Sequence, residues 1–134
     1  MEEAIVRVEH LSHRYSVDWA IRDINLEVKS KGVFGLLGSN GAGKSTTMNI
    51  ICGVLNQTEG NVWINNINLR ENPVEAKKFI GFLPQRPPLY PDMTVEEYLT
   101  YCANLRLMEP MEIGKAVERA MARCGVTHFR SRLL

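Results

Sequence analysis

One glycine-rich segment has the composition of a ligand-binding loop: residues 38–46 read Gly-Ser-Asn-Gly-Ala-Gly-Lys-Ser-Thr. Glycines let a backbone approach a ligand closely and adopt conformations that other residues avoid. Consecutive backbone N–H groups in such a loop form a nest for anions, and the lysine adds a positive charge. The pattern Gly-x-x-x-x-Gly-Lys-Ser therefore predicts a site for the phosphates of a nucleoside triphosphate with magnesium.

The pattern also assigns separate roles to the residues of this segment. We expect Lys44 to reach the β- and γ-phosphates and the Ser45 hydroxyl to ligate magnesium. We expect Thr46 to donate to a phosphate oxygen. The backbone around the phosphates is expected to come from Ser39, Asn40, Gly41, Ala42 and Gly43. The alternative is a glycine-rich turn before an ordinary helix, which the flanking segments disfavour.

The flanking segments are the elements that would position this loop. Residues 33–37 (Val-Phe-Gly-Leu-Leu) are apolar without polar alternation, which predicts a short buried strand. Residues 44–55 carry apolar side chains along one side, which predicts a helix. The N-terminus of that helix would add unpaired N–H donors and a partial positive charge at the loop.

The rest of the chain reads as a sheet-rich part to about residue 83, followed by a helical part. Alternating polarity predicts strands over 5–10 and 24–28, and the pair Asn65-Asn66 predicts a tight turn between two further short strands. A capping box at Thr94 and Glu97 begins one helix, and Gly125 ends another. The remaining expected elements are strands over 61–64, 67–69 and 79–83, a helical turn over 74–78, a proline-rich loop over 84–91 and a helix over 111–124.

Composition is that of an ordinary globular chain. The 134 residues are 45% hydrophobic and 23% charged, with a formal net charge of +1 and no long basic run, so nothing indicates nucleic acid as a partner. No apolar run reaches the length of a membrane span, and the acidic N-terminus is not a signal peptide. The three cysteines are widely spaced, which favours reduced thiols and a reducing cytoplasm.

Three features together resemble the nucleotide-binding domains of ATP-binding cassette (ABC) proteins. They are the loop over residues 36–46, the aromatic residue Tyr15 ahead of it, and the segment over 80–97 that contains Gln85. Ser39 departs from the family, in which most members have proline. The resemblance covers residue 5 to the end. It implies an α/β P-loop NTPase core with N-terminal antiparallel strands over residues 1–86, and the start of a helical subdomain over 87–134.

The resemblance also implies roles for residues outside the loop. In the family an aromatic residue at the position of Tyr15 stacks on adenine. A glutamine at the position of Gln85 contacts magnesium and the attacking water, and the surface over 84–98 receives a membrane subunit. Each position also has a simpler interpretation: Tyr15 as an edge of the core, Gln85 as a solvated loop residue and the proline-rich segment as a connector.

By this resemblance the chain is similar to the ATP-binding subunit of an ABC transporter. Such a subunit binds ATP and Mg²⁺, pairs with a second nucleotide-binding domain and lies on the cytoplasmic face of the membrane through a permease partner. The segment over 80–97 most resembles the cassettes of bacterial exporters. Two alternatives remain open: a soluble ABC-type ATPase acting on ribosomes or DNA, and a different P-loop enzyme such as a small kinase or a GTPase.

Several motifs of the family do not occur in the sequence. It has no Ser-Gly-Gly signature, no apolar run followed by Asp-Glu and no later switch histidine. We therefore expect the chain to be the N-terminal part of a longer protein, with a short natural product as the alternative. We also expect it not to hydrolyse ATP alone, and the strand over 33–37 to have an open edge.

Overall fold

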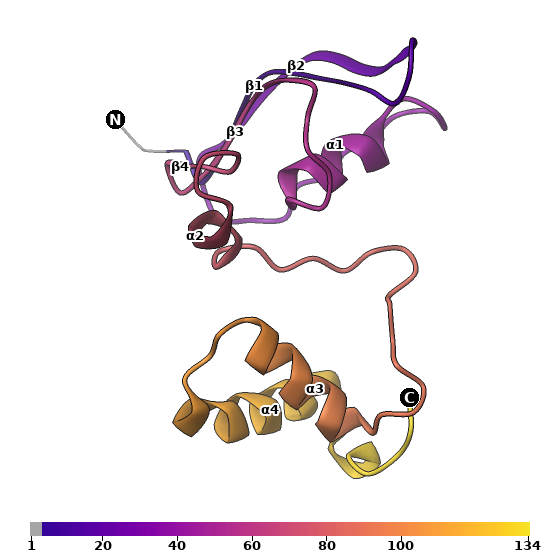
Figure 1. The fold of residues 1–134 in the computed structure, drawn as a ribbon, viewed down its shortest axis with the longest axis vertical. Helices are drawn as coiled ribbons and strands as arrows, with labels where there is room; N and C mark the ends of the chain where they lie inside the picture. Colours follow the sequence, from indigo (N-terminus) through magenta and orange to yellow (C-terminus); the bar gives the residue numbers. More distant parts are fainter. Residues whose placement is uncertain (1–3) are drawn as a thin grey trace. The chain divides into compact units, whose positions relative to one another are not determined.

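The computed structural model describes residues 4–134, which fall into two compact units, Met1–Phe82 and Leu83–Leu134. Figure 1 shows the strands and helices of unit 1 and the helices of unit 2. The sheet of unit 1 has four strands in the order β2-β1-β3-β4. Its strands are β1 (Val6–Arg14), β2 (Trp19–Val28), β3 (Glu59–Ile64) and β4 (Ile67–Asn68).

The hairpin between β3 and β4 confirms the predicted turn. Asn65 and Asn66 have φ angles of 47° and 63°, the left-handed region that a tight hairpin turn requires. Asparagine tolerates this conformation because its short side chain hydrogen-bonds locally. The turn thereby fixes the register in which Ile64 pairs with Ile67.

A paired irregularity explains why β1 and β2 run further than the alternating sequence pattern predicts. His10 and Asp23 both have φ of 50°, and the pairing of β1 with β2 shifts register between Val8 and Leu11. The His10 Nδ1 atom lies 2.8 Å from Asp23 Oδ1, and the Asn25 amide donates to the Asp23 carbonyl at 2.9 Å. The bulge breaks the alternation of burial, but pairing resumes beyond it.

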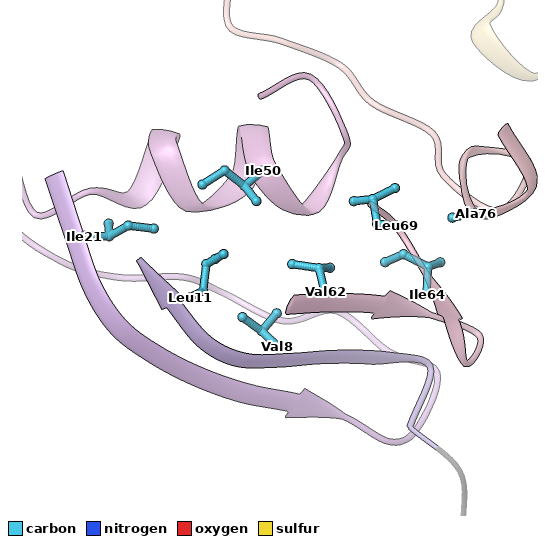
Figure 2. Packing of buried hydrophobic residues seen from close by; sticks show 8 residues of the cluster. All are labelled: Val8, Leu11, Ile21, Ile50, Val62, Ile64, Leu69 and Ala76. Atoms are coloured by element: carbon cyan, nitrogen blue, oxygen red, sulfur yellow. The ribbon is translucent and has the colours of Figure 1, made fainter. Parts of the chain in front are cut away.

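One face of the sheet carries the core of unit 1. Figure 2 shows Leu11 and Val62 of the sheet directed toward Ile50, which lies on helix α1 (Lys44–Ile51). All three side chains are fully buried. The same cluster includes Leu69 and also Ala76 of the short helix α2 (Pro73–Lys77). These contacts hold α1, and with it the end of the glycine-rich loop, on the sheet.

Helix α1 ends earlier than predicted. It stops at Ile51 rather than residue 55, with Gly53 following at φ 72°. A Cβ atom on Gly53 would lie 2.6 Å from Cε of Lys77, so the chain turns here against α2. The cap itself is local, because the Gly53 N–H donates to the Ile50 carbonyl at 3.0 Å and the Val54 N–H donates to the Asn49 carbonyl at 2.8 Å. The apolar periodicity beyond Ile51 obscured this signal.

Two predicted strands do not form. Residues 33–37 are irregular and exposed, with Val33 fully exposed and Leu37 at 93%, and residues 79–83 are irregular as well. A buried parallel strand needs hydrogen-bonded neighbours on its edges. Residues 4–134 contain no strand that pairs with either segment, so the apolar pattern lacks the ladder that would bury it.

Unit 2 consists of α3 (Val95–Leu105), α4 (Pro110–Cys124) and a short 3₁₀ helix, η1 (Thr127–Phe129). The capping box is confirmed: the Glu97 N–H donates to Thr94 Oγ1 at 3.2 Å, and the Thr94 N–H donates to Glu97 Oε2 at 2.8 Å. Gly125 ends α4 at φ 68°, as predicted. Thr94 also forms an isolated bridge with Leu133, which fastens the end of the unit to the start of α3.

Candidate functional site: a phosphate-binding loop

The glycine-rich loop leads directly into the N-terminus of α1. Gly41 and Gly43 have φ angles of 83° and 90°, which side-chain-bearing residues rarely adopt. The Ala42 N–H donates to the Ser39 carbonyl at 3.1 Å, so the loop closes on itself before the helix begins. The glycine spacing thus produces the turn-then-helix path that the sequence predicts.

Gly43 touches the sheet so closely that no side chain fits. A Cβ atom there would lie 2.2 Å from Cγ2 of Ile21 and 2.7 Å from the Ala20 carbonyl oxygen. The loop therefore rests directly on β2. Sequence reasoning missed Ala20 as part of the site, because only the folded arrangement brings β2 under the loop.

The start of α1 is free of groups that would compete with an anion. Its N-cap, Gly43, provides no side-chain hydrogen bond, and the first turn contains no acidic residue. The first N–H groups of a helix have no intrahelical partner. The Thr47 hydroxyl donates to the Gly43 carbonyl at 2.9 Å and so holds the loop against the helix. The helix end is suited to receiving a phosphate.

The Lys44 side chain folds back across the loop. Its Nζ atom donates to the carbonyl oxygens of Gly38 and Ser39, the latter at 2.7 Å. The ammonium charge is thereby held within the loop. A cavity of about 280 Å³ opens beside it, lined by Ala20, Asn40, Gly41, Gly43, Lys44, Ser45 and Thr46.

Tyr15 reaches the same site from the end of β1. Its hydroxyl lies 3.1 Å from Oγ1 of Thr46, although the two residues are 31 positions apart in the sequence. The residue is 66% exposed, so most of its ring surface is open to contact. Unit 1 therefore brings Tyr15 together with the loop, as the adenine role would require.

Gln85 belongs to unit 2, where it lies exposed in the loop that precedes α3. Its expected contact with magnesium stays a prediction. Within residues 4–134 no group of three or more His, Cys, Asp or Glu side chains could hold a metal ion. A magnesium site here would instead combine a hydroxyl such as that of Ser45 with phosphate oxygens.

These features fit a magnesium-bound nucleoside triphosphate. The uncapped helix N-terminus, the glycine that rests on β2 and the inward ammonium of Lys44 all suit a phosphate chain. Fold and site together define a P-loop nucleotide-binding domain.

Comparison with known proteins places the chain within this class. A family model described as "ABC transporter" matches residues 21–134. The chain belongs to the ABC transporter family.

Similar proteins include two ATP-binding proteins. One is "Uncharacterized ABC transporter ATP-binding protein YhaQ" of Bacillus subtilis, 33% identical over 96% of this chain and 42% of that protein. The other is "Molybdate/tungstate import ATP-binding protein WtpC" of Pyrococcus abyssi, 32% identical over 96% of this chain and 37% of that protein. The chain thus spans less than half the length of these relatives.

Solved structures of the same family superpose on the chain. An ATP-binding subunit of an ABC transporter matches with a TM-score of 0.83 and 26% identity, over 96% of this chain and 54% of that chain. The cassette MJ0796, in a dimeric structure bound to ADP and Pi, matches with a TM-score of 0.79 and 26% identity, over 96% of this chain and 61% of that chain. The α/β P-loop fold predicted from the sequence is confirmed. Among the described residues, no helix is long and apolar enough to cross a bilayer.

Proposed function

We propose that this chain is the nucleotide-binding part of an ABC transporter's ATP-binding subunit, which binds and hydrolyses ATP to power transport through a separate membrane subunit. The observation that carries the proposal is the loop over Gly38–Thr46, which is closed by Lys44 and joined to Tyr15 through Thr46. A phosphate site and an aromatic surface next to each other suit the two ends of ATP.

At the phosphate end, the proposal gives the loop backbone from Ser39 to Gly43 the task of surrounding the phosphate chain. The Lys44 ammonium, which donates to the carbonyls of Gly38 and Ser39, would pair with the β- and γ-phosphates. Hydrogen bonds to charged phosphate oxygens are stronger than those to neutral carbonyls. Thr46 would donate its hydroxyl to a phosphate oxygen. At the other end, the exposed ring of Tyr15 would stack on adenine.

Hydrolysis needs the phosphate charge to be neutralised and the attacking water to be oriented. Magnesium, when bound, would supply part of that neutralisation. We assign Ser45 and Gln85 to its coordination, and Gln85 also to contact with the water. Lys44 is the residue of unit 1 that would stabilise charge on the transferred phosphoryl group.

We propose that a second nucleotide-binding domain completes the ATP site.

We also propose that the surface over 84–98 of unit 2 binds the membrane subunit. An aromatic cluster at this surface supports the proposal. The ring of Tyr90 packs edge-on against Tyr101 at 5.7 Å between centroids, and the Tyr98 hydroxyl donates to the Pro88 carbonyl at 3.2 Å. Leu89 beside it is 48% exposed, so a preformed apolar surface is available. This arrangement would place the protein in the cytoplasm, on the inner face of the membrane.

We further propose export as the direction of transport, because residues 80–97 resemble the cassettes of exporters. Relatives of this chain include an importer subunit, so the direction requires its own test. Everted membrane vesicles that contain the complete transporter would accumulate the substrate on ATP addition if it exports. Uptake that occurs only in right-side-out vesicles or whole cells would contradict export.

Lys44→Ala in the whole ATP-binding subunit tests the nucleotide role. We expect ATP affinity to fall about 10-fold or more, because a charged hydrogen bond is worth about 1.5–3 kcal/mol, and turnover to be lost. Lys31→Ala, which removes an exposed lysine outside the loop, is the matched control and should leave both unchanged. Unchanged affinity and turnover in Lys44→Ala would refute the proposal. ATPase activity stimulated by ribosomes or DNA rather than by the permease would favour the soluble alternative.

A further inference from the structure

His13, near the end of β1, is a polar residue with a buried side chain. Packing alone does not explain why a histidine is buried here. It is 7% exposed, and its Nε2 atom is buried without a hydrogen-bond partner among the described residues. The Nδ1 atom lies 3.4 Å from the Thr58 hydroxyl, which is long for a hydrogen bond. An unpaired buried ring nitrogen costs free energy, so an apolar side chain would suit this position better if filling space were its only task.

The close contact of His13 is with Tyr15. The two ring centroids are 4.7 Å apart and the ring planes meet at 85°, an edge-to-face arrangement that aromatic rings prefer. Tyr15 directly follows Arg14, the last residue of β1, and the chain after the strand places its ring against that of His13. Thr58 also lies against His13, because its hydroxyl is 3.4 Å from Nδ1 of the ring and accepts the Arg14 N–H at 3.2 Å.

Tyr15 is held at two points as a result. The buried His13 ring supports its ring, and Thr46 of α1 contacts its hydroxyl. A tyrosine that is 66% exposed would otherwise sample several rotamers, and ordering it on ligand binding would cost entropy. The support that His13 gives would remove part of that cost in advance.

We propose that His13 is a positioning residue for adenosine recognition: its ring holds Tyr15 in the orientation that stacks on the base. The inference rests on the proposed nucleotide function and adds a residue that would not itself touch the nucleotide. It predicts that His13 affects the adenosine part of the binding energy and leaves the phosphate part alone.

The test compares two variants of equal polarity and similar size in the whole ATP-binding subunit. His13→Phe keeps an aromatic ring, and His13→Leu fills the buried space without one. Each is titrated with Mg²⁺-ATP and with Mg²⁺-tripolyphosphate, which lacks the nucleoside. We expect His13→Leu to weaken ATP binding about 2- to 10-fold, as loss of an edge-to-face pair implies, and to leave tripolyphosphate binding unchanged. His13→Phe should bind both ligands like the wild type.

A double-mutant cycle with Tyr15→Ala then shows whether His13 acts through Tyr15. In the Tyr15→Ala background, His13→Leu should cause no further loss of ATP affinity. Independent losses, equal losses for both ligands, or equal behaviour of His13→Leu and His13→Phe would each overturn the inference. Lys44→Ala separates this outcome from the proposed function, because it should weaken both ligands whatever His13 does.

Discussion

The Tyr15 hydroxyl lies 3.1 Å from Oγ1 of Thr46, which joins the end of β1 to the first turn of α1. Tyr15 is the residue that we assign to the base, and Thr46 is one that we assign to the phosphates. The residues that we assign to the two ends of ATP are therefore in direct contact.

The Tyr15 ring and its hydroxyl should make separable contributions. Tyr15→Ala should weaken ATP binding by about 1–3 kcal/mol, the value of a base–aromatic stack, without changing tripolyphosphate binding. Tyr15→Phe keeps the ring and removes the bond to Thr46, so its ATP affinity should stay within a few-fold of the wild type. Calorimetric titration of the three proteins measures both effects. A Tyr15→Ala variant with normal ATP affinity would show that the ring does not contact the base.

Gly43 and Gly41 offer a matched pair in the loop. An alanine at Gly43 would strain φ and also collide with Ile21 and Ala20, whereas the space around Gly41 is open. Gly41→Ala should cost about 1–2 kcal/mol of stability from the left-handed conformation alone, and Gly43→Ala should cost more. Denaturant unfolding gives the stabilities, and tripolyphosphate titration shows whether the loop keeps its shape. Equal effects of both variants would mean that β2 does not support the loop as described.

The capping box at α3 predicts a smaller effect in unit 2. Thr94→Ala removes the acceptor for the Glu97 N–H and should destabilise the helix by about 1 kcal/mol. Thr94→Ser keeps the hydroxyl and serves as the control. Hydrogen exchange at the amides of the first turn of α3 reports the local change. Equal protection in the two variants would show that the side-chain cap contributes nothing.

Asp23 predicts a response to acid. The hydrogen bond with His10, and after it that with Asn25, lowers the pKa of the Asp23 carboxyl below its ordinary value of 3.8. A group whose pKa is lower in the folded state contributes stability above the unfolded value and loses it as pH falls through the folded value. The melting temperature of the wild type should therefore fall relative to that of Asp23→Asn as pH drops below 3.8. We expect the change in melting temperature to be small, because Asp23 is exposed to solvent. A difference in melting temperature between the two proteins that stays constant over this pH range would contradict the prediction.

Much of the site was predictable because its determinants are local. The glycines and Lys44 encode the loop, Asn65-Asn66 encodes the hairpin and Thr94 with Glu97 encodes the start of α3. Each of these features is determined by residues that lie within a few positions of one another, so the sequence alone is enough to predict it.

Most of the predictions that were wrong have the same cause: the feature depends on contacts with segments that are distant in the sequence. The apolar run over 33–37 predicts a buried strand, but burial of a strand requires pairing that residues 4–134 do not supply. The contact of Ala20 with Gly43 likewise depends on tertiary packing. The early end of α1 is different, because Gly53 caps the helix locally and the apolar periodicity obscured that signal. The extension of β1 and β2 depends on the bulge at His10 and Asp23, for which periodicity gives no signal.

The irregular pairing of β1 with β2 also bears on where the chain can change length. Beyond the bulge the register shifts again between Leu11 and His13 and between His13 and Arg14, so Tyr15 is placed by its own contacts with His13 and Thr46 and not by the strand register. Residues added at the tip, where Val17 is 82% exposed, would extend into solvent without displacing Tyr15. The tip is thus a position for a reporter group or an inserted peptide close to the nucleotide site.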